Sequence, residues 1–148
     1  MDRKLKIGLI GAGGIGSRVH MPGYSRMDNV EIVAVCDIQL ERAQSLAETY
    51  AIPHVFENYE DLLALPGLDA VDICTPNYLH SIIAVKALER GLHVFCEKPD
   101  AINVEEAEKM KAAAEKSGKT LMVMRNTRYL LTSAFLKQYI EDGKLGDI

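Results

Sequence analysis

Short apolar runs alternate with amphipathic stretches along most of the chain. Each apolar run is brief and rich in β-branched residues, a pattern that is typical of strands buried on both faces of a sheet. Polar residues with Gly, Pro, Asn or Asp separate the runs and indicate turns. The pattern predicts about six strands, over residues 5–10, 31–37, 54–56, 70–74, 93–96 and 120–124.

Helical patterns fill the intervals between these strands. Asn58 predicts the start of a short helix, and Asn103 with Glu106 predicts a capping box at the start of another. Pro22 and Gly23 predict a kink or a split in the helix that follows the first strand. Because strand and helix alternate, each pair of parallel strands needs a right-handed helical crossover. The sequence therefore predicts an α/β fold, with a doubly wound parallel sheet and helices on both faces, the longer ones over about residues 39–50, 78–90 and 103–118.

The first predicted strand runs directly into a glycine-rich turn. In such a turn, Gly11 permits a sharp bend, Gly13 lets the backbone approach a pyrophosphate, and Gly16 lets the following helix pack against the strand. Phosphates then lie on the free N–H groups at the positive end of the helix dipole. We therefore expect a Rossmann-type fold that binds dinucleotide phosphates through Gly11, Ala12, Gly13, Gly14, Ile15 and Gly16.

Asp37 ends the second predicted strand, roughly 20 residues after the glycine turn, where an acid accepts hydrogen bonds from the adenosine ribose hydroxyls. A carboxylate there repels a 2′-phosphate, so the sequence favours NAD over NADP. Arg42, one turn into the next helix, is interpreted as part of a solvated helix face rather than as a phosphate ligand. The main alternative for a glycine turn followed by an acid is a methyltransferase, in which the acid binds the ribose of S-adenosylmethionine.

Composition and charge narrow the class of protein. The 148 residues are 48% hydrophobic and 26% charged, as expected for one folded domain with a core. The formal net charge of −4 argues against nucleic acid or an anionic membrane as partner, and no apolar run approaches the ~20 residues of a spanning helix. No secretory signal is recognised. The three cysteines, Cys36, Cys74 and Cys96, have no CxxC spacing, which indicates reduced, buried thiols rather than disulfides or a metal site. We therefore expect a cytoplasmic protein without bound metal.

Three further motifs follow the later strands in order. They are Thr75-Pro76-Asn77-Tyr78-Leu79-His80, then Glu97-Lys98-Pro99, then Asn126-Thr127-Arg128-Tyr129. With the glycine turn, they make the sequence resemble the glucose–fructose oxidoreductase/inositol dehydrogenase/MocA family of sugar dehydrogenases over essentially the whole chain. The resemblance implies an N-terminal domain that binds NAD or NADP, and a second α/β domain that forms the other wall of the substrate site.

The positions of these motifs agree with a site at one edge of the sheet. Because ligands of open α/β sheets bind at the carboxyl ends of the strands, the segment Thr75–Asn77 is expected near the nicotinamide. Lys98 resembles the family's catalytic lysine, which hydrogen-bonds the substrate hydroxyl and relays its proton as hydride leaves the same carbon. The alternative for Lys98 is a surface ion pair with Glu97. Glu97 is expected to bind the nicotinamide ribose or to orient the loop that Pro99 fixes, with a cis Lys98–Pro99 bond as an option.

Two other residues of these motifs keep alternative roles. His80 lies at a helix start, where capping or packing is favoured over direct chemistry, although the resemblance places it with the cofactor-binding residues. Arg128 follows the sixth strand and is expected either to reach the cofactor amide or a substrate, or to form an interdomain ion pair. His20 and His54 are interpreted as structural.

The last stretch of the chain has a different pattern. Thr132 is expected to cap a helix that ends near Asp142, and residues 144–148 are expected to begin a further strand. The helix carries an apolar stripe of Phe135, Leu136, Tyr139 and Ile140.

This pattern predicts two parts in the chain. Residues 1–128 form an NAD(P)-binding domain, and residues 129–148 form a helix and connector toward a second α/β substrate domain that is absent from this chain. Without that partner, the apolar stripe is expected to be exposed or to drive self-association into a homo-oligomer.

Two functions are compatible with the sequence. The first is the NAD(P)-binding domain of an oxidoreductase, a dehydrogenase that transfers hydride between the CH–OH group of a sugar, polyol or related substrate and a nicotinamide cofactor. The chain alone is then expected to be inactive, because one wall that positions the substrate is missing. The second is a stand-alone, non-catalytic dinucleotide-binding module.

Overall fold

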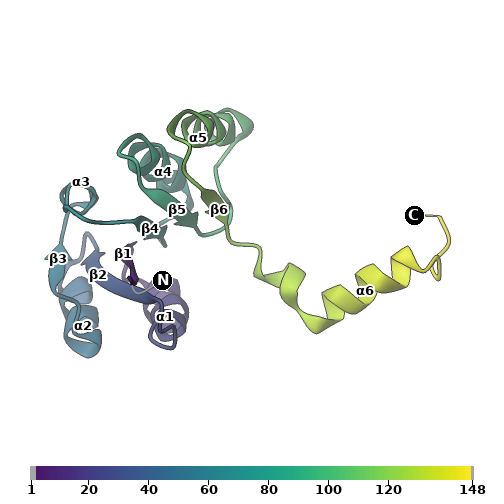
Figure 1. Cartoon of the computed structure of the whole chain (residues 1–148), viewed down its shortest axis with the longest axis horizontal. Helices are drawn as coiled ribbons and strands as arrows, with labels where there is room; N and C mark the ends of the chain where they lie inside the picture. The colour runs from purple at the N-terminus through teal and green to yellow at the C-terminus, as the bar shows by residue number, and fades with distance from the viewer. Residues whose placement is uncertain (1–2, 148) are drawn as a thin grey trace.

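The computed structural model, which describes residues 3–147, is built around a six-stranded sheet in the order β3-β2-β1-β4-β5-β6 (Figure 1). All neighbouring strands are parallel, and the direction in which strands are added reverses between β1 and β4. The doubly wound α/β fold predicted from the sequence is therefore confirmed. The strands are β1 (Leu5–Ile10), β2 (Val30–Cys36), β3 (His54–Phe56), β4 (Ala70–Ile73), β5 (His93–Cys96) and β6 (Leu121–Val123).

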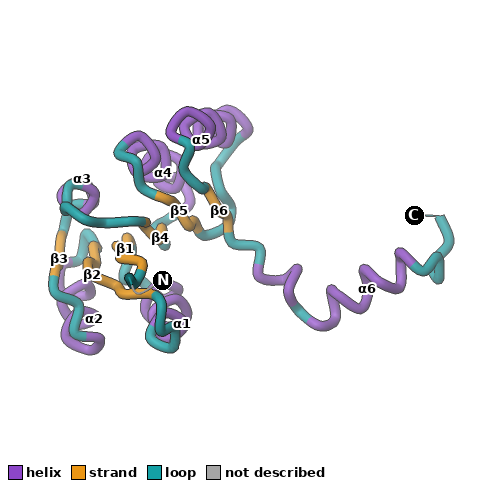
Figure 2. Tube along the Cα trace, in the orientation of Figure 1, coloured by secondary structure: helices purple, strands orange, loops and turns teal. Residues whose placement is uncertain are grey.

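The helices next to the sheet form two layers on its opposite faces (Figures 1 and 2). Right-handed crossovers that run in opposite directions from β1 and β4 require this arrangement. Asn58 and Asn103 cap their helices through their side chains, as predicted. Among residues 3–147, however, the predicted capping box is not completed, because the Glu106 carboxylate accepts from Ser81 and Lys109 instead of from the Asn103 N–H. One layer holds α1 (Met21–Tyr24) and α2 (Leu40–Tyr50), and the other holds α3 (Tyr59–Leu63), α4 (His80–Glu89) and α5 (Val104–Ser117).

Successive residues of the central strands enter two separate cores, because neighbouring side chains of a strand point to opposite faces. Leu9 and Val35 pack with residues of α1 and α2. Ile10 and Ile73 pack with residues of α4 and α5. Both faces of the sheet are covered there, which explains the continuous apolar runs in the sequence.

The helix that follows β1 changes its hydrogen-bond pattern before Pro22. The chain is helical from residue 14 to residue 24, but Gly16–His20 is a π-helical segment in which the Met21 N–H donates to the Gly16 carbonyl. Proline has no N–H and cannot continue an α-helical ladder, which accounts for the wider turn. The predicted irregularity is confirmed, and His20 at the end of this segment is buried.

The helix α6 (Leu131–Glu141) stands away from the sheet and has no buried residue (Figure 1). Its N-cap is Leu130, whose side chain has no acceptor, so the prediction that Thr132 caps this helix is wrong. The predicted exposure of the stripe is confirmed, because Phe135 and Leu136 are 69% and 51% exposed.

The prediction of a strand over residues 144–148 is wrong for residues 144–147. These residues form a turn and an irregular end, since no strand of the described chain lies beside them to supply hydrogen bonds. Ile148 lies outside the described residues. Over residues 3–147, the structure has no helix of the length and apolarity needed to cross a membrane.

Candidate dinucleotide-binding site

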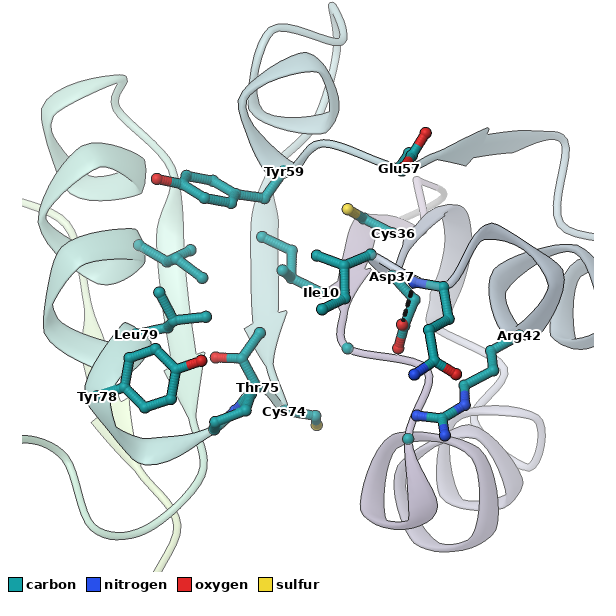
Figure 3. Close-up of a pocket in the computed structure, with 16 residues that line it drawn as sticks. Ile10, Cys36, Asp37, Arg42, Glu57, Tyr59, Cys74, Thr75, Tyr78 and Leu79 are labelled. Carbon is teal, nitrogen blue, oxygen red and sulfur yellow. Dashed lines mark hydrogen bonds between the residues drawn. The ribbon is translucent and has the colours of Figure 1, made fainter.

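A cleft of about 310 Å³ opens beside the carboxyl ends of β1 and β4 (Figure 3). The strand order reverses at this point, which is where open α/β sheets bind their ligands. Five of the residues predicted to bind cofactor lie on its wall although they come from three separate loops. They are Gly11, Gly13, Asp37, Thr75 and Pro76.

The glycines of the turn meet different surroundings. Gly11 has a φ of +104°, and a Cβ there would lie 2.6 Å from the Cys74 carbonyl oxygen. A Cβ on Gly16 would overlap the Gly11 carbonyl oxygen. Around Gly13, apart from Gly13 itself and its two chain neighbours, no heavy atom of the described residues lies within 4 Å of the position of a Cβ. Gly11 and Gly16 therefore shape the turn, whereas Gly13 leaves space that fits the approach of a pyrophosphate.

Asp37 connects the end of β2 to the glycine turn. Its Oδ2 accepts the Ala12 N–H at 2.8 Å, and its Oδ1 accepts the Gln39 N–H at 2.9 Å, the bond drawn in Figure 3. A carboxylate offers about four lone-pair directions, so each oxygen keeps capacity for a ribose hydroxyl. The position and spare acceptors of Asp37 fit the predicted role.

The Thr75 hydroxyl on the cleft wall is a buried polar atom that has no hydrogen-bond partner among residues 3–147. Buried hydroxyls in proteins normally have a partner. Thr75 itself lines the cleft, so this orphaned atom, the space at Gly13 and the acceptors of Asp37 lie around one cleft and fit a bound dinucleotide.

His80 at the start of α4 is fully buried and ties two loops together. Its Nδ1 lies 2.6 Å from the Pro99 carbonyl oxygen, and its Nε2 lies 2.8 Å from the Thr75 carbonyl oxygen. These contacts confirm the packing role. They also fix the backbone of Thr75, which lines the cleft. A direct contact between His80 and the cofactor stays a prediction.

The loop Glu97–Pro99 follows β5 and exposes Lys98 to solvent. The Lys98–Pro99 peptide bond is cis. Glu97 Oε2 accepts the backbone N–H of Lys98 at 3.0 Å, so Glu97 orients the loop. Within the described chain, the ion pair of Glu97 is with His20, and none joins its carboxylate to the Lys98 ammonium. A contact of Glu97 with the nicotinamide ribose stays a prediction.

A buried polar cluster lies behind this loop. Asp72 in the central strand β4 is 0% exposed, and its Oδ2 lies 2.6 Å from Nδ1 of His20. Burial lowers the pKa of His20, but hydrogen bonds and charges from Asp72 and Glu97 outweigh burial and raise that pKa above its usual value. Burial and the Asp72 charge also raise the pKa of Tyr24, whose ring meets the His20 ring edge-on.

The Cys74 thiol belongs to the same cluster. Donor atoms of His20, Asp72 and Cys74 lie within 4.8 Å of one another, a grouping that could hold a metal ion. Burial raises the pKa of Cys74 far above its usual value, and its Sγ lies 3.4 Å from Nδ1 of His20, so the three groups form one cluster of polar contacts. Burial likewise raises the pKa of Cys36 and of Cys96 to about 12, and all three cysteines are free, as predicted.

Several predicted residues lie outside the cleft wall. Asn77 and Arg128 are exposed in short 3₁₀ turns after β4 and β6, and Gly14 and Ile15 are exposed where the first helix begins. Lys98 is exposed beyond the cleft. Cofactor contacts of these residues stay predictions.

The structure adds residues that the sequence analysis left without a role. Ile38 lines the cleft. So do Tyr78, Leu79 and Arg42 (Figure 3), although Arg42 was interpreted as part of a solvated helix face. Ile38 is 83% exposed directly after the strand-end acid, and an apolar residue at that place was the available signal. For Asp72, the signal was an acid inside an otherwise apolar strand.

The strand order, the glycine turn and the cleft at the reversal define a dinucleotide-binding domain of the Rossmann type. The family model GFO_IDH_MocA, described as "Oxidoreductase family, NAD-binding Rossmann fold", matches residues 5–125. The chain belongs to this family, which confirms the resemblance and NAD as the family's cofactor.

Curated relatives and solved structures agree with this placement. The chain is 38% identical over 144 residues to D-glucoside 3-dehydrogenase of Escherichia coli (strain K12) and 39% identical over 143 residues to glucose-6-phosphate 3-dehydrogenase of Bacillus subtilis (strain 168). Each match covers 97% of this chain, but only 41% and 40% of the relatives. The crystal structure of the WlbA dehydrogenase from Bordetella pertussis, in complex with NADH and UDP-GlcNAcA, matches with a TM-score of 0.91 at 32% identity and covers 97% of this chain and 44% of that one. The chain therefore spans less than half the length of these relatives.

Proposed function

We propose that this chain binds NAD in the cleft beside β1 and β4 and serves as the cofactor-binding part of a dehydrogenase that acts on a CH–OH group of a sugar or polyol. The observation that carries the proposal is that the glycine turn, Asp37 with its acceptors, and Thr75, whose hydroxyl has no partner among residues 3–147, line one cleft. The relatives named above are dehydrogenases of sugar-type substrates, which supports the substrate class.

The residues on the cleft wall divide the work of binding. Backbone N–H groups after Gly13 hold the pyrophosphate, Asp37 accepts the ribose hydroxyls, and Thr75 donates to or accepts from the cofactor. Bound NAD supplies the hydride acceptor. Lys98 hydrogen-bonds the substrate hydroxyl, and its amine, in the unprotonated form, accepts the hydroxyl proton as hydride leaves the same carbon for the nicotinamide.

The alternative of a non-catalytic dinucleotide module is not favoured, because the family and the named relatives are oxidoreductases. We propose the cytoplasm as the compartment, on the ground of the three free thiols. Self-association through α6 also belongs to the proposal, because its apolar side chains are exposed.

Calorimetry of the chain with NAD and NADP tests the cofactor assignment. We expect NAD to bind more tightly, because the Asp37 carboxylate repels a 2′-phosphate. Asp37→Asn keeps an acceptor for the Ala12 N–H but removes the charge, so the preference for NAD should fall about tenfold, or ~1.4 kcal/mol. Asp61→Asn, at an exposed position, is the matched control. Binding of neither cofactor would contradict the proposal, and an unchanged preference in Asp37→Asn would remove the ribose role of Asp37.

The role of Lys98 is tested by hydride transfer in an enzyme of the relatives' full length that contains this chain. Loss of a proton-transfer group costs about 10²–10⁴-fold in rate, so Lys98→Met should lower kcat by that factor with the KM for NAD little changed. Lys116→Met, on the exposed face of α5, is the control. Normal turnover by Lys98→Met would exclude this role.

A further inference from the structure

A continuous line of buried polar contacts runs from Asp72 through His20 to Glu97 and ends at the backbone of Lys98. Asp72 Oδ2 lies 2.6 Å from His20 Nδ1, and His20 Nε2 lies 3.0 Å from Glu97 Oε1. Glu97 Oε2 then accepts the Lys98 N–H at 3.0 Å. The side chains of His20, Asp72 and Glu97 are 3%, 0% and 14% exposed, so water does not replace these contacts. None of the roles proposed above uses His20 or Asp72.

The donors and acceptors of this line determine the protonation state of His20. An ionised carboxylate only accepts hydrogen bonds, and a neutral imidazole donates from only one nitrogen. Both ring nitrogens of His20 face carboxylate oxygens, so with both carboxylates ionised both contacts are hydrogen bonds only when the ring is an imidazolium. A neutral ring would leave a nitrogen lone pair against a buried carboxylate oxygen, which is costly.

The other groups around the ring do not offer a competing charge. Cys74 Sγ lies 3.4 Å from Nδ1 and comes from the end of β4, and Tyr24 comes from α1. Burial raises the pKa of both groups far above neutrality, so both are uncharged. Phe95 of β5 covers the ring from a third side. Asp72 and Glu97 are therefore the charged groups that hold His20.

We propose that His20, as an imidazolium anchored by Asp72, is a positioning residue that holds Glu97 in place so that Glu97 fixes the backbone of Lys98. His20 lies on the helix that begins at the glycine turn, so the cofactor turn and the lysine loop share this anchor. The inference rests on the proposed function, because the position of Lys98 matters for chemistry only in a dehydrogenase.

The protonation of His20 is measured by long-range ¹H–¹⁵N NMR of the histidine rings in the 148-residue chain, with NADH binding followed by calorimetry on the same samples. We expect hydrogen on both ring nitrogens of His20 at about pH 7, where an ordinary histidine is mostly neutral. The Lys98 amide resonance should move as His20 loses its proton at higher pH, since Glu97 connects the two.

Two variants separate positioning from a merely structural role. In Glu97→Gln, the amide group donates to an unprotonated Nε2 while its oxygen still accepts the Lys98 N–H, so the Lys98 amide should stop following His20. In His20→Gln, Glu97 loses its anchor, and hydrogen exchange at the Lys98 amide should accelerate at least tenfold. His54→Gln, an exposed histidine, should leave that exchange unchanged.

A neutral His20 at about pH 7 would overturn the inference. A Lys98 amide that still follows His20 in Glu97→Gln would overturn it as well, and this result stands even where His20→Gln fails to fold. If the wild-type chain did not bind NADH, the proposed function would be contradicted, but the protonation of the His20 ring could still be measured. Failure of the proposed function and failure of this inference are therefore distinguishable.

Discussion

Gly11, Gly13 and Gly16 belong to one motif, but each is needed for a different reason. Gly11 takes a positive φ beside the Cys74 carbonyl, and Gly16 packs against the Gly11 carbonyl. Gly13 faces the open cleft. Stability and binding should therefore respond separately to substitution within the same turn.

Gly16→Ala and Gly13→Ala form a matched pair that tests this separation. The new methyl group in Gly16→Ala overlaps backbone, so the free energy of unfolding should fall by about 1–3 kcal/mol. Gly13→Ala has room for its methyl group and should leave that free energy within ~0.5 kcal/mol of wild type. It should weaken NADH binding, because the methyl group occupies the path of the pyrophosphate. Urea unfolding measures the free energy of unfolding, and calorimetry measures NADH binding. If Gly13→Ala bound NADH with wild-type affinity, the space at Gly13 would not be the place of the pyrophosphate.

At the scale of elements, the cluster around His20 joins three segments at one end of the sheet. The π-helical segment carries His20, β4 carries Asp72, and the loop after β5 carries Glu97. A second histidine, His80, ties that loop to the end of β4 through Pro99 and Thr75. The loop with Lys98 is thus held from two sides by buried imidazole rings.

The cluster also predicts how stability depends on pH. The pKa of His20 is raised in the folded protein, so folding increases its affinity for the proton. This contribution is fully present below the unfolded pKa of about 6.5 and is lost as the pH rises through the folded value. The stability advantage of wild type over His20→Gln should therefore shrink as the pH rises above about 6.5. Urea unfolding at several pH values measures it, with His54→Gln as control, and a constant or growing advantage would contradict the prediction.

At the scale of the whole molecule, the sheet with its two helical layers holds the described core, and α6 stands apart from it (Figure 1). The family match ends at residue 125, before α6 begins. The proposed boundary at residue 128 agrees with both facts but stays a prediction. Exposed Leu131, Phe135 and Leu136 give α6 an apolar surface.

A chain that ends at residue 128 tests the independence of the sheet. Because α6 buries no residue, its removal should change the free energy of unfolding by no more than ~0.5 kcal/mol. Leu88→Ala, at a buried position of α4 in the core, should lower the free energy of unfolding by about 2–5 kcal/mol and serves as the control that the assay detects a loss of that size. The shortened chain should also self-associate less in sedimentation experiments. A stability loss above ~1 kcal/mol would mean that α6 belongs to the same folding unit.

Much of the fold was predictable because its signals are local. Apolar runs, the caps at Asn58 and Asn103, and the break at Pro22 each act within a few residues. The predicted cap at Thr132 was wrong, because the position of a cap depends on where the chain leaves the preceding turn. The strand predicted after residue 143 was wrong, because a strand needs a neighbouring strand to pair with. In the site, Asp37 was predictable from its place at a strand end, whereas the cleft-facing position of Arg42 depends on how α2 packs.

The order of strands and helices, the glycine turn and the acid that follows it can be read from the chain alone, because periodicity and backbone freedom are properties of short stretches. The contacts of His20 with Asp72 and Glu97, which lie 52 and 77 residues away in the chain, exist only in the folded molecule. The folded chain also leaves the hydroxyl of Thr75, a residue of the cleft wall, without a partner among residues 3–147. Parallel strands bring distant residues to one edge of the sheet, and their strand order, which no local pattern encodes, selects the side chains that meet there.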